Sequence, residues 1–166
     1  MTRDPTMTSG VMAAPLEPMH AVTMHTAEDF VRGFERFWAA PSVEALGEHL
    51  HADVVLAQPL LARPARGLAA AKATFAKIFA AIPDLRGFVD RWSASGDTIF
   101  IELRLRGTVG GEVVEWPLVD RFIVRDGLAL ERASYFDPTV LLAAVARHPT
   151  SWWALARSGI LGGLLR

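Results

Sequence analysis

Asp120 is the residue of this sequence best placed to carry out proton-transfer chemistry. It lies in the run 112–125, where it shares one parity with Trp116, Leu118 and Phe122. Because successive side chains of a strand point to opposite faces, this alternation predicts a strand that holds Asp120 among large apolar side chains. A carboxyl group there suits general acid–base catalysis, unless a cation or hydrogen-bond donors keep it charged. The plainer interpretation is an aspartate that is paired with an arginine or exposed.

Arg132 and Ser134 share a parity in the next apolar run, 128–136. If Ser134 points inward, Arg132 approaches the same site, where it either pairs with Asp120 or holds a substrate carboxylate. The alternative is an arginine at the rim that bridges to Glu131 or Glu115, and the sequence alone favours this alternative.

Gln58 shares a parity with Val54 and Leu56 at the end of a third expected strand. Its amide either orients a water or binds a carbonyl group, or it satisfies the loop that begins at Pro59. Tryptophans such as Trp38, Trp92 and Trp116 belong to a core more often than to a ligand platform. The further side chains expected to shape a ligand site are Phe34, Trp38, Leu103, Trp116 and Phe136.

Metal and nucleic-acid chemistry find little support in this chain of 166 residues, which has no cysteine and a formal net charge of −1. The charge gives no general attraction to phosphate, so we expect no nucleic-acid partner. His49 and His51 are two residues apart, whereas a helical metal pair is spaced at i and i+4. We therefore predict no metal and no cofactor.

The elements that must position these side chains follow from periodicity and from prolines. Apolar residues spaced by three or four predict a helix from about Thr26 to Pro41, a short one after Ser42, and another over 67–82. Alternation and turn residues predict strands over 53–58, 88–94, 98–108, 112–125 and 128–136. Asp137 and Pro138 begin a last helix, which extends to Arg147. Helices followed by a meander of strands indicate an α+β domain.

Three stretches resemble the nuclear transport factor 2-like superfamily, which includes ketosteroid isomerases, limonene epoxide hydrolases and SnoaL-like polyketide cyclases. They are LHADVVLAQPLLARPARG at 50–67, PLVDRFIVRDG at 117–127 and ASYFDP at 133–138. The resemblance implies a cone-shaped barrel, in which a strongly curved antiparallel sheet is closed by three N-terminal helices and followed by a C-terminal helical extension. It also implies an apolar pocket inside the cone.

The enzyme groups of this superfamily differ in how many of their catalytic residue types occur in this chain. In the isomerase pattern the base position falls on Gln58 and the tyrosine on Phe34, so that only the second acid, Asp120, is retained. In the epoxide hydrolase pattern the required Asp–Arg–Asp set falls on Leu103, Leu105 and Ser134, none of which fits. The resemblance to SnoaL-like cyclases implies less, because a single carboxylate there serves as acid and base.

The predicted domain covers residues 25–147, between a flexible tail over 1–24 and a hydrophobic extension over 148–166. The absence of a continuous apolar leader and of cysteine favours a cytoplasmic protein. The segment 151–166 is rich in Trp and Leu, and we interpret it as docking on its own domain or on a subunit partner. Anchoring at a membrane surface is the less favoured alternative.

Four charged residues, Glu102, Arg104, Arg106 and Arg121, are predicted on the outer sheet face. They form either a solvated surface or the homodimer surface that the superfamily commonly builds there. The sequence as a whole predicts a SnoaL-like protein that binds an apolar small molecule. One hypothesis is a cofactor-independent cyclase- or isomerase-type enzyme that acts on a carbonyl compound. The other is a non-catalytic ligand-binding or dimeric scaffold domain.

Overall fold

Helix α1 supplies most of the aromatic side chains that cover the sheet. In this computed structural model, which describes residues 24–147, α1 spans Met24–Ala39 and ends just before Pro41. Its buried positions recur every three or four residues and so form one face. They are Ala27, Phe30, Val31, Phe34, Phe37 and Trp38.

The second segment is shorter than a regular helix. It is a single 3₁₀ turn, Ala45–Glu48 (η1), and the backbone N–H of Ala45 donates to the Ser42 hydroxyl at 3.2 Å. Strand β1 (Leu50–Ala57) follows, then the two-residue strand β2 (Ala65–Arg66), and then helix α2 (Leu68–Ala81). Gly67 precedes α2 with a φ of +81°, which a glycine adopts without steric penalty.

The rest of the sheet is a continuous meander of long strands. These are β3 (Arg86–Ser95), β4 (Thr98–Val109), β5 (Glu112–Arg125) and β6 (Leu128–Tyr135). The six strands lie in the order β2-β1-β6-β5-β4-β3. All neighbouring pairs are antiparallel except β1 and β6, which run parallel.

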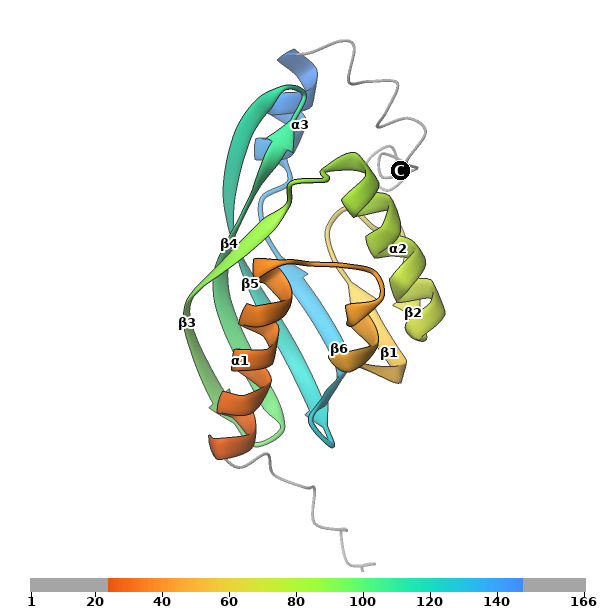
Figure 1. Ribbon diagram of the computed structural model, residues 1–166, viewed down its shortest axis with the longest axis vertical. Helices are drawn as coiled ribbons and strands as arrows, with labels where there is room; N and C mark the ends of the chain where they lie inside the picture. Colours follow the sequence, from red (N-terminus) through yellow and green to blue (C-terminus); the bar gives the residue numbers. More distant parts are fainter. Residues whose placement is uncertain (1–23, 148–166) are drawn as a thin grey trace, which may run out of the picture.

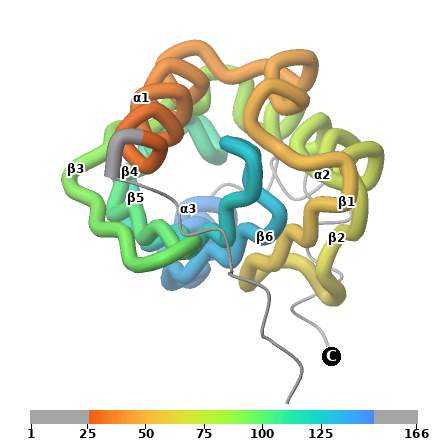
Figure 2. The backbone as a smooth tube through the Cα atoms, turned by 90° about the horizontal axis from the view of Figure 1, so that it is seen from below, coloured from red at the N-terminus to blue at the C-terminus, as the bar shows by residue number. Residues whose placement is uncertain are grey.

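The sheet curves around its helices, as the predicted cone requires. Helix α1 lies against the β3 side of the sheet and α2 against β1 and β2 (Figure 1). Seen from below, the helices and the strands together outline a ring (Figure 2). The predicted α+β cone is therefore confirmed.

Helix α3 (Thr139–Arg147) closes the described part of the chain. Its start follows the prediction, because the Asp137 carboxylate accepts hydrogen bonds from the backbone N–H and the hydroxyl of Thr139, at 2.9 and 2.7 Å. Within residues 24–147, no helix is long and apolar enough to cross a bilayer. The predictions for 151–166 and for most of the N-terminal tail fall outside the described residues.

The outer face of the sheet carries the charged side chains expected there. Arg104 donates to Asp90 and Glu115, at 2.9 and 3.2 Å. Similar pairs join Arg91 to Glu102 and Arg121 to Glu131. Between these pairs lie four exposed apolar or aromatic side chains, Phe88, Phe100, Val119 and Tyr135.

Candidate active site: a buried arginine–aspartate pair

Asp120 lies on the concave face of the sheet and is fully buried, with 0% of its surface exposed. In the strand register it is opposite Ile101 of β4 and Ser134 of β6. Trp116, Leu118 and Phe122 are buried with it, as the parity of β5 predicts. The pattern therefore placed this carboxylate on the correct face.

Both oxygens of the Asp120 carboxylate accept hydrogen bonds. Oδ2 accepts from Nε and Nη2 of Arg132, at 3.0 and 2.6 Å. Oδ1 accepts from the Ser134 hydroxyl at 2.5 Å. Because Arg132 is opposite Phe122 in the register, its guanidinium reaches Asp120 along the diagonal of the strand pair. The carboxylate thus has a cation and a neutral donor to replace its lost hydration.

The expectation that Arg132 bridges at the rim to Glu131 or Glu115 is wrong. Arg132 is only 4% exposed, and those two acids pair with Arg121 and Arg104 on the outer face. The physical reason is strand parity: Glu131 points outward, so its neighbour Arg132 must point inward. A buried guanidinium then needs a buried acceptor, which Asp120 provides.

Four aromatic rings surround the Arg132 guanidinium. Its Cζ lies 5.4–5.7 Å from the centroids of the rings, which is within the range of cation–π attraction. The rings belong to α1, α2 and β5, so that three elements meet at this one cation. They are Phe34, Trp38, Phe75 and Phe122.

Trp38 is held close to the sheet by the absence of a side chain at Gly87 in β3. A Cβ at Gly87 would lie 2.8 Å from Cγ and 2.9 Å from Cβ of Trp38. Trp38 also has the one buried side-chain polar atom, Nε1, that lacks a hydrogen-bond partner among the described residues. A buried donor left in this way is destabilising, so it is a feature that requires an explanation.

The other predicted site residues lie farther from the pair. Trp116 and Leu103 are buried on the same face. Trp116 is four residues from Asp120 along β5, about 13 Å at the usual strand rise. Gln58 follows the end of β1, and its backbone C=O accepts from the Leu61 N–H at 3.0 Å. Phe136 is partly buried against the core. In the described part of the chain, no side-chain hydrogen bond or ring contact joins Gln58 or Phe136 to Asp120.

Sequence reasoning missed Phe75 and Gly87 as parts of this site, and it placed Phe122 beside Asp120 but not against Arg132. Phe75 falls within the apolar spacing that predicts the helix over 67–82, but nothing in the sequence relates that helix to Arg132. The signal for Gly87 was present, because an isolated glycine in a strand often marks a close backbone or side-chain approach.

The chemistry open to this arrangement is limited by the hydrogen bonds already made. A carboxylate oxygen has two acceptor sites, so Oδ1 keeps one for a substrate proton after it accepts from Ser134. The Arg132 charge is adjacent and would favour any negative charge that develops on a bound oxygen. Within residues 24–147, no three acidic or histidine side chains lie close enough together to hold a metal ion.

The relationship to known proteins is decided by a family model. The model described as SnoaL-like domain matches residues 19–132, a stretch that includes both Asp120 and Arg132. This chain belongs to the SnoaL-like domain family. A search of curated proteins gives no match.

Solved structures confirm the fold of this SnoaL-like chain. A putative SnoaL-like polyketide cyclase from Jannaschia sp. CCS1 superposes with a TM-score of 0.65 at 20% identity, covering 81% of this chain and 98% of that one. IdmH, a putative polyketide cyclase from Streptomyces antibioticus, gives 0.63 at 22% identity, with 72% and 98% covered. TerC, co-crystallised with polyporic acid, gives 0.66 at 17% identity, with 73% and 98% covered.

Proposed function

We propose that this SnoaL-like protein binds an apolar carbonyl compound on the concave side of its sheet. We further propose that it acts on the compound as a cofactor-independent cyclase- or isomerase-type enzyme, with Asp120 as the acid–base group. The observation that carries the proposal is a carboxylate that is fully buried in apolar surroundings yet supplied with donors on both oxygens. The residues proposed to contact the ligand are Phe34, Trp38, Gln58, Leu103, Trp116, Arg132, Ser134 and Phe136.

The proposed reaction begins with proton removal. Oδ1 of Asp120 takes a proton from the carbon beside the carbonyl, and the C–H electrons form an enolate. In an isomerisation the same proton returns to a different carbon. In a cyclisation the enolate carbon forms a bond to a second carbonyl carbon, whose oxygen takes the proton. Either way the carboxylate is regenerated, and no oxidant or cofactor is consumed.

The fold relatives support this choice of reaction class. Two of the superposed structures are described as putative polyketide cyclases, and TerC was co-crystallised with polyporic acid. Their identity to this chain is low, so the substrate class is carried over as a proposal.

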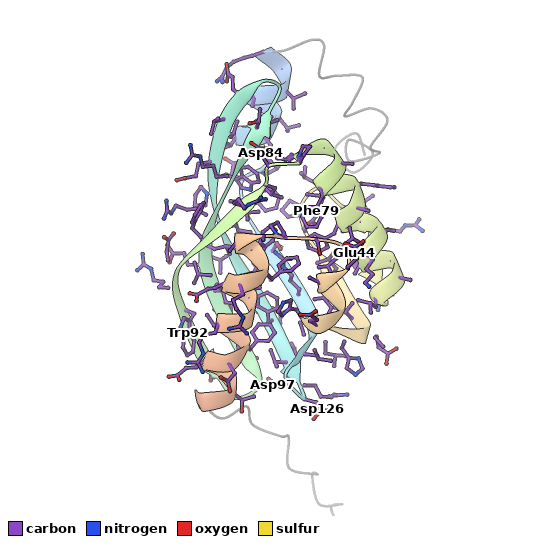
Figure 3. The ribbon with its side chains drawn as sticks, in the orientation of Figure 1. Glu44, Phe79, Asp84, Trp92, Asp97 and Asp126 are labelled. Atoms are coloured by element: carbon purple, nitrogen blue, oxygen red, sulfur yellow. The ribbon has the colours of Figure 1, made fainter. Side chains whose placement is uncertain are left out.

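Proton exchange on a simple ketone tests the catalytic step. We expect the protein to accelerate deuterium exchange at the carbon beside the carbonyl of 2-tetralone, followed by NMR in D₂O. Asp120→Asn removes the acid–base group, and the rate should fall by about 10²- to 10⁴-fold, the usual contribution of such a group. Asp126→Asn is the matched control, because Asp126 is an exposed turn residue at the end of β5 (Figure 3). Full exchange activity in Asp120→Asn would remove Asp120 from the mechanism.

A non-catalytic ligand-binding domain is the second candidate, and one observation favours it. Three hydrogen bonds already hold the Asp120 carboxylate, which leaves it fewer free acceptor sites than an unpaired catalytic base has. If 2-tetralone binds but its protons exchange no faster than in buffer, this second candidate is the better description.

We also propose that two copies pair through the outer sheet face. Val119 is directly opposite Tyr135 in the register, and both are exposed. Acidic and basic side chains surround them in ion pairs, so a second copy brings no net repulsion. Val119→Arg should convert a dimer into a monomer in sedimentation velocity. A wild-type chain that sediments as a monomer at tens of micromolar would contradict the pairing.

A further inference from the structure

The Arg132 guanidinium is only partly used by its own protein. Nε and Nη2 both donate to Oδ2 of Asp120. Among residues 24–147 no hydrogen bond leaves Nη1, and because Trp38 Nε1 is the one fully buried side-chain polar atom without a partner there, Nη1 is not fully enclosed. A guanidinium has five N–H groups, and the two on Nη1 are available to a ligand or to water. The Nη1 side of Arg132 is therefore a charged donor held in place without an acceptor.

A second unpaired donor belongs to the same group of side chains. Nε1 of Trp38 is buried and has no partner among the described residues, and an indole nitrogen can only donate. The centroid of the Trp38 ring is 5.6 Å from Cζ of Arg132. The two donors come from α1 and β6 and belong to one cluster of side chains around the Arg132 guanidinium.

We propose that Arg132 Nη1 and Trp38 Nε1 form a receptor for a carbonyl oxygen, and that the ligand is a neutral, flat, unsaturated ketone. This inference rests on the proposed ligand site and names the atoms that recognise its ligand. Asp120 and Ser134 then have a positioning role as well, because they fix the orientation of the guanidinium.

The charge of the site selects a neutral ligand rather than an anion. Arg132 and Asp120 neutralise each other, and both are nearly closed off from solvent. A carboxylate ligand would add an unpaired negative charge to apolar surroundings, and desolvating an ion costs several kcal/mol in proteins. A ketone oxygen accepts both hydrogen bonds and adds no charge.

The aromatic composition of the surroundings favours a flat ligand. Phe34 is edge-on to Trp38 and to Phe122, with centroids 6.2 and 5.3 Å apart. Phe75 and Trp38 are tilted, at 6.4 Å. Aromatic groups of this kind pack best against another planar unsaturated surface, by edge or offset contacts.

The test uses three probes that differ at one position. They are 2-acetylnaphthalene, 2-ethylnaphthalene and 2-naphthoate, which present a ketone, a hydrocarbon and a carboxylate on the same ring system. Each is titrated into the full-length ¹⁵N-labelled protein, and the indole N–H signals of the five tryptophans are followed by NMR. The Trp38 signal is assigned by its loss in Trp38→Phe.

The expected result is specific to the ketone. 2-Acetylnaphthalene should move the Trp38 indole N–H signal downfield, as a new hydrogen bond requires, and 2-ethylnaphthalene should not. Trp92 is the control, because it lies on β3 (Figure 3), which β4 and β5 separate from the strand of Arg132. The ketone should bind about 30-fold more tightly than the hydrocarbon, since two hydrogen bonds of about 1 kcal/mol each correspond to that ratio.

Variants separate the two donors. Trp38→Phe and Arg132→Lys should each bring the ketone affinity down towards that of the hydrocarbon, while hydrocarbon binding changes little. The wild-type NMR titration keeps the inference testable if Arg132→Lys does not fold.

Three other outcomes would contradict the proposed carbonyl receptor or the ligand it selects. Equal affinity for the ketone and the hydrocarbon, with no shift at Trp38, would remove the donor pair and leave the proposed apolar ligand site intact. Tighter binding of 2-naphthoate would show that the site selects an anion. If none of the three probes binds, both this inference and the proposed ligand site are wrong.

Discussion

The two faces of this sheet carry the same kind of ion pair in opposite surroundings. On the concave face, Arg132 and Asp120 have side chains that are 5% and 0% exposed. On the outer face, Arg104 and its partners Asp90 and Glu115 have side chains that are 43%, 31% and 43% exposed. The distances overlap, but water screens the outer pair and barely reaches the inner one. Burial, rather than hydrogen-bond geometry, is therefore expected to decide how much stability the protein loses when one partner of a pair is removed.

The largest difference between the two faces is expected when one partner of the buried pair is removed. Arg132→Met leaves the Asp120 charge buried without a cation, and we expect a loss of about 3–5 kcal/mol in the free energy of unfolding. Urea titration monitored by tryptophan fluorescence measures it. The double variant Asp120→Leu with Arg132→Met removes both charges and should recover a large part of the loss. A single variant as stable as wild type would mean that Asp120 has another source of compensation.

A smaller effect is expected when the neutral donor is removed. Ser134→Ala leaves Oδ1 of Asp120 without its partner, at about 1–3 kcal/mol for a buried acceptor left unpaired. The same urea titration applies. Ser93→Ala, at an exposed position of β3, is the control for the loss of a serine hydroxyl from a strand. A loss no greater than that of the control would show that the hydroxyl adds little to the pair.

On the outer face, removing an arginine should cost much less stability in the same urea titration. Arg104→Gln removes two exposed ion pairs at once, yet the unfolding midpoint should move less than in Ser134→Ala. The small difference should shrink further in 1 M NaCl, because salt screens exposed charges, whereas the Arg132→Met effect should persist. A large and salt-independent loss in Arg104→Gln would remove the distinction between the faces.

The smallest expected effect is the contribution of Asp90 to how stability changes with pH. Hydrogen bonding from Arg104 lowers the pKa of Asp90 below its ordinary value. The pKa of Asp90 is thus lower in the folded than in the unfolded protein. Its contribution to stability is therefore present above about pH 4 and is lost as the pH falls through the folded pKa. Between pH 5 and pH 3 the melting temperature of Asp90→Asn should therefore fall slightly less than that of wild type. Parallel curves would show that this pair does not contribute.

Much of the fold followed from local patterns. The alternation in 98–108 and 112–125 gave strands whose ends agree with β4 and β5 within a residue. Pro41 predicted the C-terminal end of α1, and Asp137 predicted the start of α3, whereas α1 begins at Met24, two residues before the predicted start at Thr26. Parity also placed Asp120 and Ser134 on one face. These features depend on the backbone and on nearest neighbours, which a sequence records directly.

The contacts of Arg132 could not be predicted from the sequence, because they depend on four rings from three separate elements. Phe34, Phe75 and Phe122 are each ordinary core positions when viewed alone. Their meeting point is set by the curvature of the sheet and by how far α1 can approach it, which Gly87 controls. The parallel pairing of β1 with β6 was also not predicted, since nothing in either strand marks its partner.

That parallel pairing bears on how the chain is made. Val55 of β1 pairs with Glu131 of β6, so the first strand to be synthesised waits for the last. Until β6 leaves the ribosome, β1 has only the two residues of β2 beside it, and the aromatic face of α1 lacks Arg132. Pairings so distant in sequence form slowly, because a long loop must close first. Assembly of the site is therefore expected to be a late event, and a chain truncated before residue 128 should accumulate as an aggregation-prone species.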